Sequence, residues 1–372
     1  MPEEDKKNRT VKIPIIISIA ISIAVIIIIL FFTIDADTIQ TLRGADIKYE
    51  FFIIAVLLNV LFWILWGARL KVIANKLDKK VDLSLIESTK IVIANLFLAS
   101  ITPSMAGGEP VRIYLLNKKG MTLGCATASV IGERLVDAIF VLILVPIALF
   151  IVHRETQLDE TISTALLIGI VVFISFLVIF LYAISKPEKT KRFLIWINKK
   201  ITKITKKKES ESKAIKRIST EVDNFHKGII LFKQEGRITL VKAGILTALS
   251  WTSGFMIPSM LLMGLGMDPH FLLSYTAQVL LLIIVMMPTT PGSTGVAEGG
   301  IFLLYDNLSI ISRDNPLIGV FVLLFRFITY HMNLIVGTIF FSKVFKSITS
   351  FSMDKIKRYE EEKKIDNDRC NR

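Results

Sequence analysis

Cysteine is scarce in this sequence of 372 residues, which contains only Cys125 and Cys370. Two cysteines so far apart make neither a disulfide framework nor a metal cluster, and we predict no metal site. Long polar stretches are scarce as well, since hydrophobic residues make up 52% of the chain and the mean hydropathy is +0.59. Counted with glycine and without tyrosine, the apolar share is about 55–56%, above the roughly 45–50% of soluble domains. This composition excludes the soluble, fibrous and disordered classes.

The apolar residues are gathered into long runs without a charged side chain. Examples are 13–33, 162–185 and 243–267, which contain 21, 24 and 25 residues. A helix needs about 20 apolar residues to cross the hydrocarbon core of a bilayer. The sequence therefore predicts an all-α fold, a polytopic bundle of membrane helices that forms a single integral membrane domain over residues 1–372. The first run is longer than the apolar core of a signal peptide, so we interpret it as a retained anchor.

The formal net charge of +13 would suit a nucleic-acid partner, but the basic residues alternate with the apolar runs, as they do in cytoplasmic loops. We therefore predict no binding to nucleic acid. The segments rich in Lys and Arg, with 4, 6, 16 and 9 of them, are 1–12, 69–90, 186–237 and 343–372. The poor segments, with 2, 1, 0 and 1, are 34–50, 153–161, 268–270 and 306–315. The first group is predicted to be cytoplasmic and the second external, which gives a multi-pass protein of the cell membrane with both termini in the cytoplasm.

Residues 186–237 form the only long polar insert, a basic cytoplasmic loop. One interpretation is a helix on the inner leaflet that binds anionic lipid. The other is a solvated connector, and the sequence leaves both open. Residues 343–372 are predicted to be a cytoplasmic tail.

The charge distribution also predicts that two apolar stretches enter the membrane and return to the side they left. A single crossing in the stretch 91–116 would place the basic loop outside, so we interpret this stretch as a hairpin that enters from the cytoplasm. The same reasoning makes 271–305 a hairpin that enters from outside, although two full double crossings stay open. Hairpins of opposite direction are typical of inverted-repeat transporters, whose interrupted segments indicate the substrate site. The six full spans that remain are 13–33, 51–68, 130–152, 162–185, 243–267 and 316–342.

Three clusters of polar residues lie in these apolar regions, where a charged residue costs about 2.5–3.5 kcal/mol on insertion scales. The first cluster lies at the turn of the first hairpin, where two glycines let the backbone approach a ligand. Pro110 suits the first turn of a returning helix. Arg112 either faces the phosphate of a lipid headgroup or forms an internal ion pair with Glu109, three residues earlier. The candidate residues are Gly107, Gly108, Glu109 and Arg112.

The second cluster, Glu133, Arg134 and Asp137, lies near the start of the third full span. Glu133 and Asp137 are four residues apart and share a helical face, and Arg134 reaches Asp137 at three residues. Two carboxylates and one guanidinium leave a negative charge, so we expect a further cation from Arg112 or Arg326. The cluster is either a lipid site or core network, or a set of interfacial side chains that reach water.

The third cluster combines the turn of the second hairpin with an arginine of the last span: Pro291, Gly292, Gly295, Glu298 and Arg326. Arg326, Tyr330 and Asn333 fall on one helical face, and His331 lies off it. No lysine follows the glycines, so they do not form a nucleotide-binding loop. None of the three clusters has the pattern of a hydrolytic triad or a set of metal ligands. We therefore predict no catalytic residues and no cofactor.

The order of three segments resembles a known family of membrane proteins. Thr102–Leu116, Val130–Asp137 and Pro288–Glu298 are similar to motifs of the lysylphosphatidylglycerol synthase transmembrane family, which includes flippase-like proteins of the UPF0104 type. The resemblance covers almost the whole chain, although Ser293 stands where many relatives have glycine. The family includes the membrane half of multiple peptide resistance factors, which translocate aminoacylated phospholipids. Headgroup chemistry in such proteins belongs to a separate domain, and we expect no transferase domain here and no enzyme activity.

The clusters and the resemblance together predict a flippase-like protein that translocates or handles an amphiphilic phospholipid or a polyprenyl-phosphate-linked lipid. Arg112, Arg134 and Arg326 would meet the phosphate of an anionic membrane lipid, and we expect them to be grouped apart from the acids. The acids that would balance them are Glu109, Glu133, Asp137 and Glu298. Two alternatives stay open, a membrane partner that presents lipid to a separate transferase and a secondary transporter of small solutes.

The predicted topology is tested by labelling single cysteines from each side of the membrane. Cysteine at Asn117 or at Lys207 should react only from the cytoplasmic side, and cysteine at Gln157 should react from outside. Labelling of position 117 from outside, with position 207 still protected inside, would show that the first hairpin is wrong.

Overall fold

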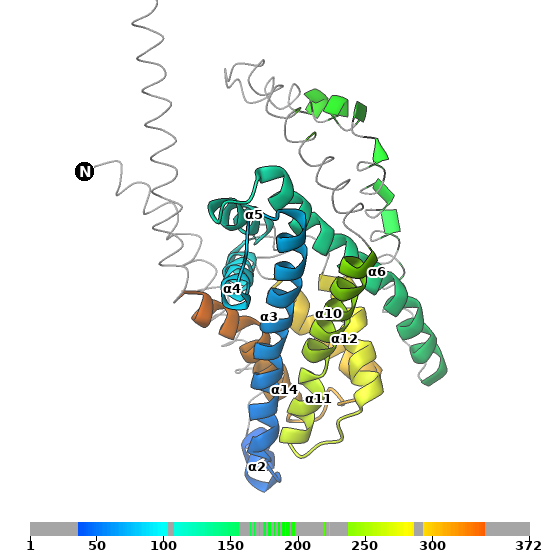
Figure 1. Ribbon diagram of the computed structural model, residues 1–372. Coiled ribbons are helices and arrows are strands. Elements are labelled where there is room, and N and C mark those ends of the chain that lie inside the picture. The colour runs from blue at the N-terminus through cyan, green and yellow to red at the C-terminus, as the bar shows by residue number, and fades with distance from the viewer. Residues whose placement is uncertain are drawn as a thin grey trace, which may run out of the picture.

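The computed structural model describes residues 36–102, 108–155, 237–285 and 293–338, together with isolated positions between 164 and 223. Every regular element in the four continuous ranges is helical (Figure 1). The elements are α2 (Ala36–Gly44), α3 (Tyr49–Leu77), α4 (Leu85–Ile101), α5 (Gly108–Lys118), α6 (Leu123–Glu155), α10 (Arg237–Phe255), α11 (Ile257–Gly264), α12 (Phe271–Val285), α13 (Val296–Asn307), α14 (Ile318–Arg326) and the π-helical turn η1 (Phe327–His331). The all-α prediction is confirmed for this part of the chain.

Four helical stretches of the described residues are long and apolar enough to cross a membrane. They are Tyr49–Leu77, Leu123–Glu155, Ile238–Gly264 and Ile318–Thr338. They form a multi-helix membrane bundle, as the apolar runs predicted. The predicted spans 13–33 and 162–185, the loop 186–237 and the tail 343–372 fall outside the four continuous ranges.

The first two of these helices are longer than the spans predicted from the apolar runs. The predicted span 51–68 ends at the first charged residue, Arg69, but α3 continues as a helix to Leu77. The span 130–152 likewise becomes the 33-residue helix α6. Arg69 does not end α3 because Glu133 and Asp137 of α6 pair with it. Helix α6 is longer chiefly because it begins at Leu123, ahead of the predicted start at 130.

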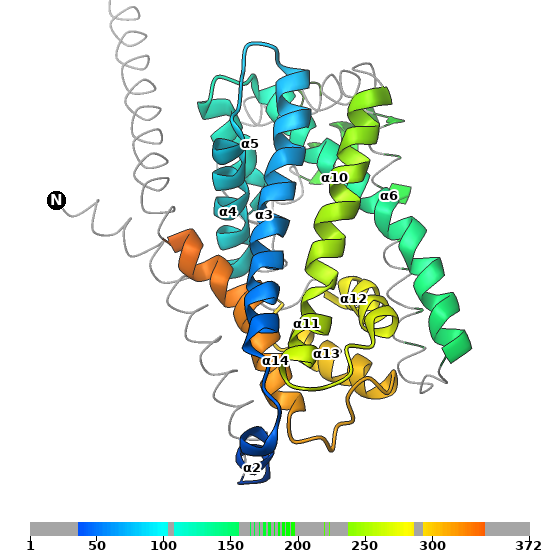
Figure 2. The ribbon, with the colours of Figure 1, turned by 60° about the horizontal axis from the view of Figure 1, so that its bottom comes forward.

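Helix α3 lies between two apolar cores and contacts α4, α6, α10, α11 and η1. The core at its C-terminal half joins residues such as Leu70 and Ile73 to α4, α5 and the start of α6. The second core joins Ala55 to α11, α12, α13, α14 and the second half of α6. Figure 2 shows α10 beside α3 on one side, with α4 and α5 on the other.

The two predicted hairpins correspond to two pairs of short helices. Helix α4 packs against α5, and α12 packs against α13. These helices contain 17, 11, 15 and 12 residues, fewer than the roughly 20 needed to cross a membrane. The α4–α5 pair belongs to the core at the C-terminal half of α3 and the α12–α13 pair to the other core. The two pairs therefore lie toward opposite ends of α3.

Three segments predicted to be external meet at the Tyr49 end of α3. The Thr38 hydroxyl donates a hydrogen bond to the carbonyl of Pro316 at 3.2 Å. The backbone N–H of Lys48 donates to the carbonyl of Gly264 at 3.0 Å, which draws the chain around 268–270 to the same end. Which side of the membrane this end faces stays a prediction.

The opposite end is held together by polar contacts around the start of α4. Ser84 caps this helix, since its hydroxyl accepts from the Glu87 N–H at 3.2 Å and the Glu87 carboxylate accepts from the Ser84 N–H at 3.1 Å. Glu87 also binds Lys119, and this contact, with the bonds from Ser84, lowers the pKa of Glu87 to about 2. The Thr122 N–H donates to Asp78 at 3.1 Å. These bonds join the ends of α3, α4 and α5 to the start of α6.

Close packing of α3 on α4 depends on Gly67. A Cβ atom at this position would lie 2.8 Å from the backbone N and Cα atoms of Thr89. Because backbone atoms cannot yield without separating the helices, Gly67→Ala should destabilise the protein by about 1–3 kcal/mol. The measurement is the midpoint of thermal unfolding in detergent. Gly244→Ala is the matched control, since nothing lies within 4 Å of its added Cβ, and equal midpoints for the two variants would contradict the close approach.

Candidate functional site

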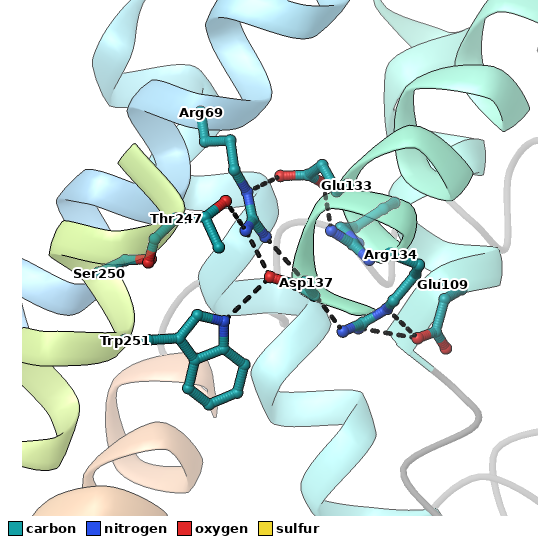
Figure 3. A network of polar contacts seen from close by, with 9 residues as sticks. Arg69, Glu109, Glu133, Arg134, Asp137, Thr247, Ser250 and Trp251 are labelled. Atoms are coloured by element: carbon teal, nitrogen blue, oxygen red, sulfur yellow. Dashed lines mark hydrogen bonds and ion pairs between the residues drawn. The ribbon is translucent and has the colours of Figure 1, made fainter. Parts of the chain in front are cut away.

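Arg69 of α3 lies at the centre of a network of buried charges (Figure 3). Its side chain is 2% exposed. The Nε atom donates to Glu133 Oε1 at 3.0 Å, and Nη1 donates to Asp137 Oδ1 at 2.6 Å. Nη1 also donates to the Thr247 hydroxyl at 2.7 Å, and Nη2 lies 3.4 Å from Asp137 Oδ2. One guanidinium therefore joins α6 and α10 to α3.

A second buried guanidinium, that of Arg112 on α5, binds the other oxygen of Glu133. Both side chains are 0% exposed, and Arg112 Nη1 donates to Glu133 Oε2. Glu133 thus lies between two arginines, one from α3 and one from α5. The Nε and Nη2 atoms of Arg112 are buried and have no hydrogen-bond partner within the described part of the chain.

The third arginine, Arg134, lies at the exposed edge of the network. Its Nε and Nη2 atoms contact Glu109 Oε1 at 3.0 and 2.8 Å, and Nη1 lies 3.4 Å from Asp137 Oδ2. The Arg134 and Glu109 side chains are 36% and 33% exposed. Asp137 also accepts from the indole N–H of Trp251 at 3.0 Å. The network therefore extends from a buried centre to a half-buried edge.

The indole ring of Trp66 lies among the three guanidinium groups. Its centroid is 5.6 Å from Cζ of Arg69, 5.4 Å from Cζ of Arg112 and 5.8 Å from Cζ of Arg134. An aromatic face attracts cations at such distances. A small cavity of about 10 Å³ adjoins the ring, with room for about one water molecule. It is lined by Phe62, Trp66, Arg69, Asp137, Ser250 and Trp251.

The network is electrically balanced. Its arginines are Arg69, Arg112 and Arg134, and its acids are Glu109, Glu133 and Asp137. Buried charges are tolerated when they are paired and hydrogen-bonded, so balance of this kind is required for the helices to pack. The further cation that was expected to balance Glu133 and Asp137 is present as Arg112. Arg69 was not among the predicted site residues because it was assigned to the basic loop 69–90, although its place next to a charge-free run was a usable signal.

The expectation that the arginines are grouped apart from the acids is wrong. Each candidate arginine contacts a carboxylate, since an unpaired guanidinium would carry a large desolvation cost. The possible ion pair between Glu109 and Arg112 is also absent from the contacts of these described residues. Glu109 binds Arg134 instead, whereas the local pairing of Arg134 with Asp137 is confirmed.

The third cluster forms a separate ion pair. Arg326 Nε donates to Glu298 Oε1 at 2.7 Å, and both side chains are nearly buried. The other oxygen of Glu298 accepts from the Gly295 N–H at 2.6 Å. Gly295 has φ of +88°, a conformation that favours glycine, and it caps the start of α13. Arg326 Cζ also lies 4.3 Å from the ring centroid of Tyr330.

A π-helical turn follows Arg326 and is held by α3. The Asn59 amide donates to the carbonyl of Ile328 at 2.8 Å, and the Trp63 indole N–H donates to Asn333 Oδ1 at 2.9 Å. Single π turns within helices occur frequently at functional sites. Asn333 therefore faces α3, while Arg326 faces α13.

The remaining candidates lie around the hairpin turns. Gly107, Pro291 and Gly292 lie outside the described residues. Gly108 is the first residue of α5, and a Cβ there would overlap the Asn95 side chain of α4. Its role is thus a close approach of two helices. Pro110 is the third residue of α5 and therefore lies in its first turn, as the sequence predicted.

Helices long enough to span a membrane, with a balanced ion network between them, define a multi-pass membrane protein with a charged interior. Residues 15–337 match the family described as the lysylphosphatidylglycerol synthase TM region. The chain belongs to this family, and the predicted resemblance is confirmed.

Three archaeal relatives are similar over most of their length. A UPF0104 membrane protein of Archaeoglobus fulgidus is 34% identical over 291 residues, which cover 77% of this chain and 84% of the relative. One from Methanocaldococcus jannaschii is 26% identical over 294 residues, covering 78% and 83%. One from Methanothermobacter thermautotrophicus is 22% identical over 270 residues, covering 72% and 77%.

Removal of the central guanidinium tests the network. Arg69→Gln leaves Glu133 and Asp137 with one arginine each and a surplus negative charge, so it should destabilise the protein by about 3–5 kcal/mol. Adding Asp137→Asn should recover part of the loss because it restores neutrality. Thermal unfolding in detergent measures both effects. Arg313→Gln is the control, since Arg313 pairs with Asp306 in an exposed loop; a wild-type midpoint for Arg69→Gln would refute the central role of this residue.

Proposed function

We propose that the protein translocates an amphiphilic phospholipid or a polyprenyl-phosphate-linked lipid, whose charged headgroup passes along the ion networks while its tails stay in the bilayer. The observation that carries the proposal is the position of the buried charges within helices of membrane-spanning length. Glu133 and Asp137 lie about 15 and 21 Å along α6 from its first residue, at 1.5 Å per residue. Charged residues at such depth are costly, and they commonly mark substrate paths.

The half-buried edge of the network supports a route for the headgroup. Arg134 and Glu109 are about one-third exposed, and they are linked through Asp137 to the buried Arg69. A headgroup that arrives at this edge would meet a guanidinium first and exchange with a carboxylate partner. An anionic headgroup that replaces Glu109 at Arg134 releases a carboxylate that is one-third exposed, so the surplus negative charge arises at the edge of the network and not at its buried centre. The proposal does not include synthesis or modification of the headgroup by this chain.

A repeated arrangement of ion pairs supports an inverted repeat with two re-entrant hairpins. The second helix of each short pair begins beside a glutamate, Glu109 in α5 and Glu298 in α13. Each glutamate binds an arginine of the long helix that follows, Arg134 in α6 and Arg326 in α14. The two pairs of short helices lie toward opposite ends of α3. With both termini in the cytoplasm, the hairpins would enter the membrane from opposite sides.

The decisive experiment is scrambling of a lipid in proteoliposomes. Vesicles contain a trace of phosphatidylglycerol with a fluorescent label on an acyl chain near the headgroup, and a membrane-impermeant reductant removes the signal from the outer leaflet. Wild-type protein should expose the inner-leaflet probe, while protein-free vesicles should keep about half of the signal. Absence of scrambling by the wild-type protein would refute translocation, and co-purification with a transferase would then favour the presentation of lipid to that enzyme.

Lysine substitutions test contact between the arginines and phosphate. Arg112→Lys and Arg326→Lys keep the positive charge but lose the planar guanidinium, which binds phosphate in a bidentate way that lysine does not reproduce. Each should slow scrambling at least about tenfold, as expected from the loss of one charged hydrogen bond, with little change in folding or insertion. Arg313→Lys is the control because Arg313 lies in an exposed loop. Wild-type rates in both variants would exclude the phosphate contact.

A further inference from the structure

We propose that the Nε and Nη2 edge of Arg112 binds a phosphate oxyanion, with the indole N–H of Trp66 as a third donor. The proposal deepens the proposed function by assigning the headgroup phosphate to one guanidinium, and it rests on that function only where the phosphate belongs to a lipid. The proposed ligand is a phosphate oxyanion, which either a lipid headgroup or free phosphate can supply.

The geometry of the guanidinium supports this assignment. Nη1 of Arg112 is engaged by Glu133, and the two remaining nitrogens, Nε and Nη2, are buried and have no hydrogen-bond partner among the described residues. Their N–H bonds lie side by side on one edge of the planar group. This edge makes two parallel hydrogen bonds to carboxylates and phosphates. The unfilled donors of Arg112 are therefore the pair that suits an oxyanion.

The other two arginines of the network offer no such edge. Arg69 uses Nε, Nη1 and Nη2 on Glu133, Asp137 and Thr247. Arg134 uses Nε and Nη2 on a single carboxylate, that of Glu109. The candidate arginines are alike in the sequence, whereas the hydrogen-bonding pattern separates Arg112 from its two neighbours in the network.

Trp66 supplies a further unfilled donor at the same place. Its Nε1 atom is buried and donates to no acceptor in the described part of the chain, and its ring centroid lies 5.4 Å from Arg112 Cζ. Buried N–H groups nearly always have an acceptor, so three unfilled donor atoms on two neighbouring side chains indicate an acceptor that the described residues do not supply. A cationic ligand would be repelled by the surrounding guanidiniums, and an apolar one would leave the donors unpaired. A tetrahedral oxyanion offers several acceptors.

The charge of the network favours a singly charged ligand. Three arginines are balanced by three acids, so a phosphodiester would leave one surplus negative charge and a doubly charged phosphomonoester would leave two. Surplus charge in a buried site is costly. The phosphodiester of a glycerophospholipid is therefore the better match. The half-exposed Arg134–Glu109 edge lies beside Trp66 and gives the nearest access.

The test measures ligand-induced stabilisation of the full chain in detergent. Potassium phosphate is compared with potassium chloride at the same ionic strength, and micelles that contain phosphatidylglycerol are compared with micelles that contain diacylglycerol, which lacks phosphate. Wild-type protein should be stabilised by phosphatidylglycerol and not by diacylglycerol. Arg112→Lys should weaken the apparent affinity about tenfold to a hundredfold, and Trp66→Phe, which keeps a ring but lacks the N–H, about threefold to tenfold.

The outcomes separate the two sources of phosphate and the two proposals. Stabilisation by phosphatidylglycerol alone assigns the site to a lipid, and stabilisation by phosphate as well shows that free phosphate also binds; both support the oxyanion site. Equal affinity in wild type, Trp66→Phe and Arg112→Lys would overturn it, as would no stabilisation of the wild type. If Arg112→Lys does not fold, Trp66→Phe decides alone. If the protein scrambles lipid but its binding of phosphate does not depend on Arg112 or Trp66, only this inference is overturned. If it binds phosphate in that way but does not scramble lipid, only the proposed function is overturned. Arg313→Lys serves again as the control.

Discussion

The position of the long helices relative to one another depends on Arg69. Its guanidinium bonds at once to Glu133 and Asp137 on α6 and to Thr247 on α10, while its own helix packs on α4. Removing the partners of a charge that is buried in this way destabilises the folded protein by several kcal/mol. The helices therefore cannot slide along one another without breaking bonds that have no substitute in an apolar surrounding. Hydrophobic packing alone would not fix them so strictly, because lipid chains solvate leucine and isoleucine as well as another helix does.

The polar network lies between the two apolar cores. On one side the end of α3 packs with α4 and α5, and on the other side its beginning packs with α11, α12 and α14. Arg112, Glu133 and Asp137 join elements of the first core to α3, and Asn59 and Trp63 join α3 to η1 near the second core. The charged side chains thus lie among apolar ones, an arrangement that suits a proposed substrate with a charged head and long apolar tails.

Much of this arrangement could be predicted from the sequence, and the parts that could not be predicted have physical causes. Charge-free runs identified the long helices, and Pro110 lies in the first turn of α5 as expected. Local pairs such as Arg134 with Asp137 follow from helical periodicity. The bond between Arg69 and Asp137 joins residues 68 positions apart, and no periodicity contains that information. A membrane helix was expected to end at its first charge, yet Arg69 is buried because another helix supplies the carboxylates. The same need for partners explains why the arginines are dispersed among the acids.

The two equivalent ion pairs differ in their contact with solvent. Glu109 and Arg134 are about one-third exposed, whereas Glu298 and Arg326 are about one-tenth exposed or less. Dissolved ions screen charges over about 8 Å at physiological ionic strength, but only where solvent reaches them. Salt would therefore weaken the first pair and leave the second almost unaffected. In the proposed inverted repeat, the balance between the two halves would then depend on the ionic composition of one aqueous compartment and be insulated from that of the other.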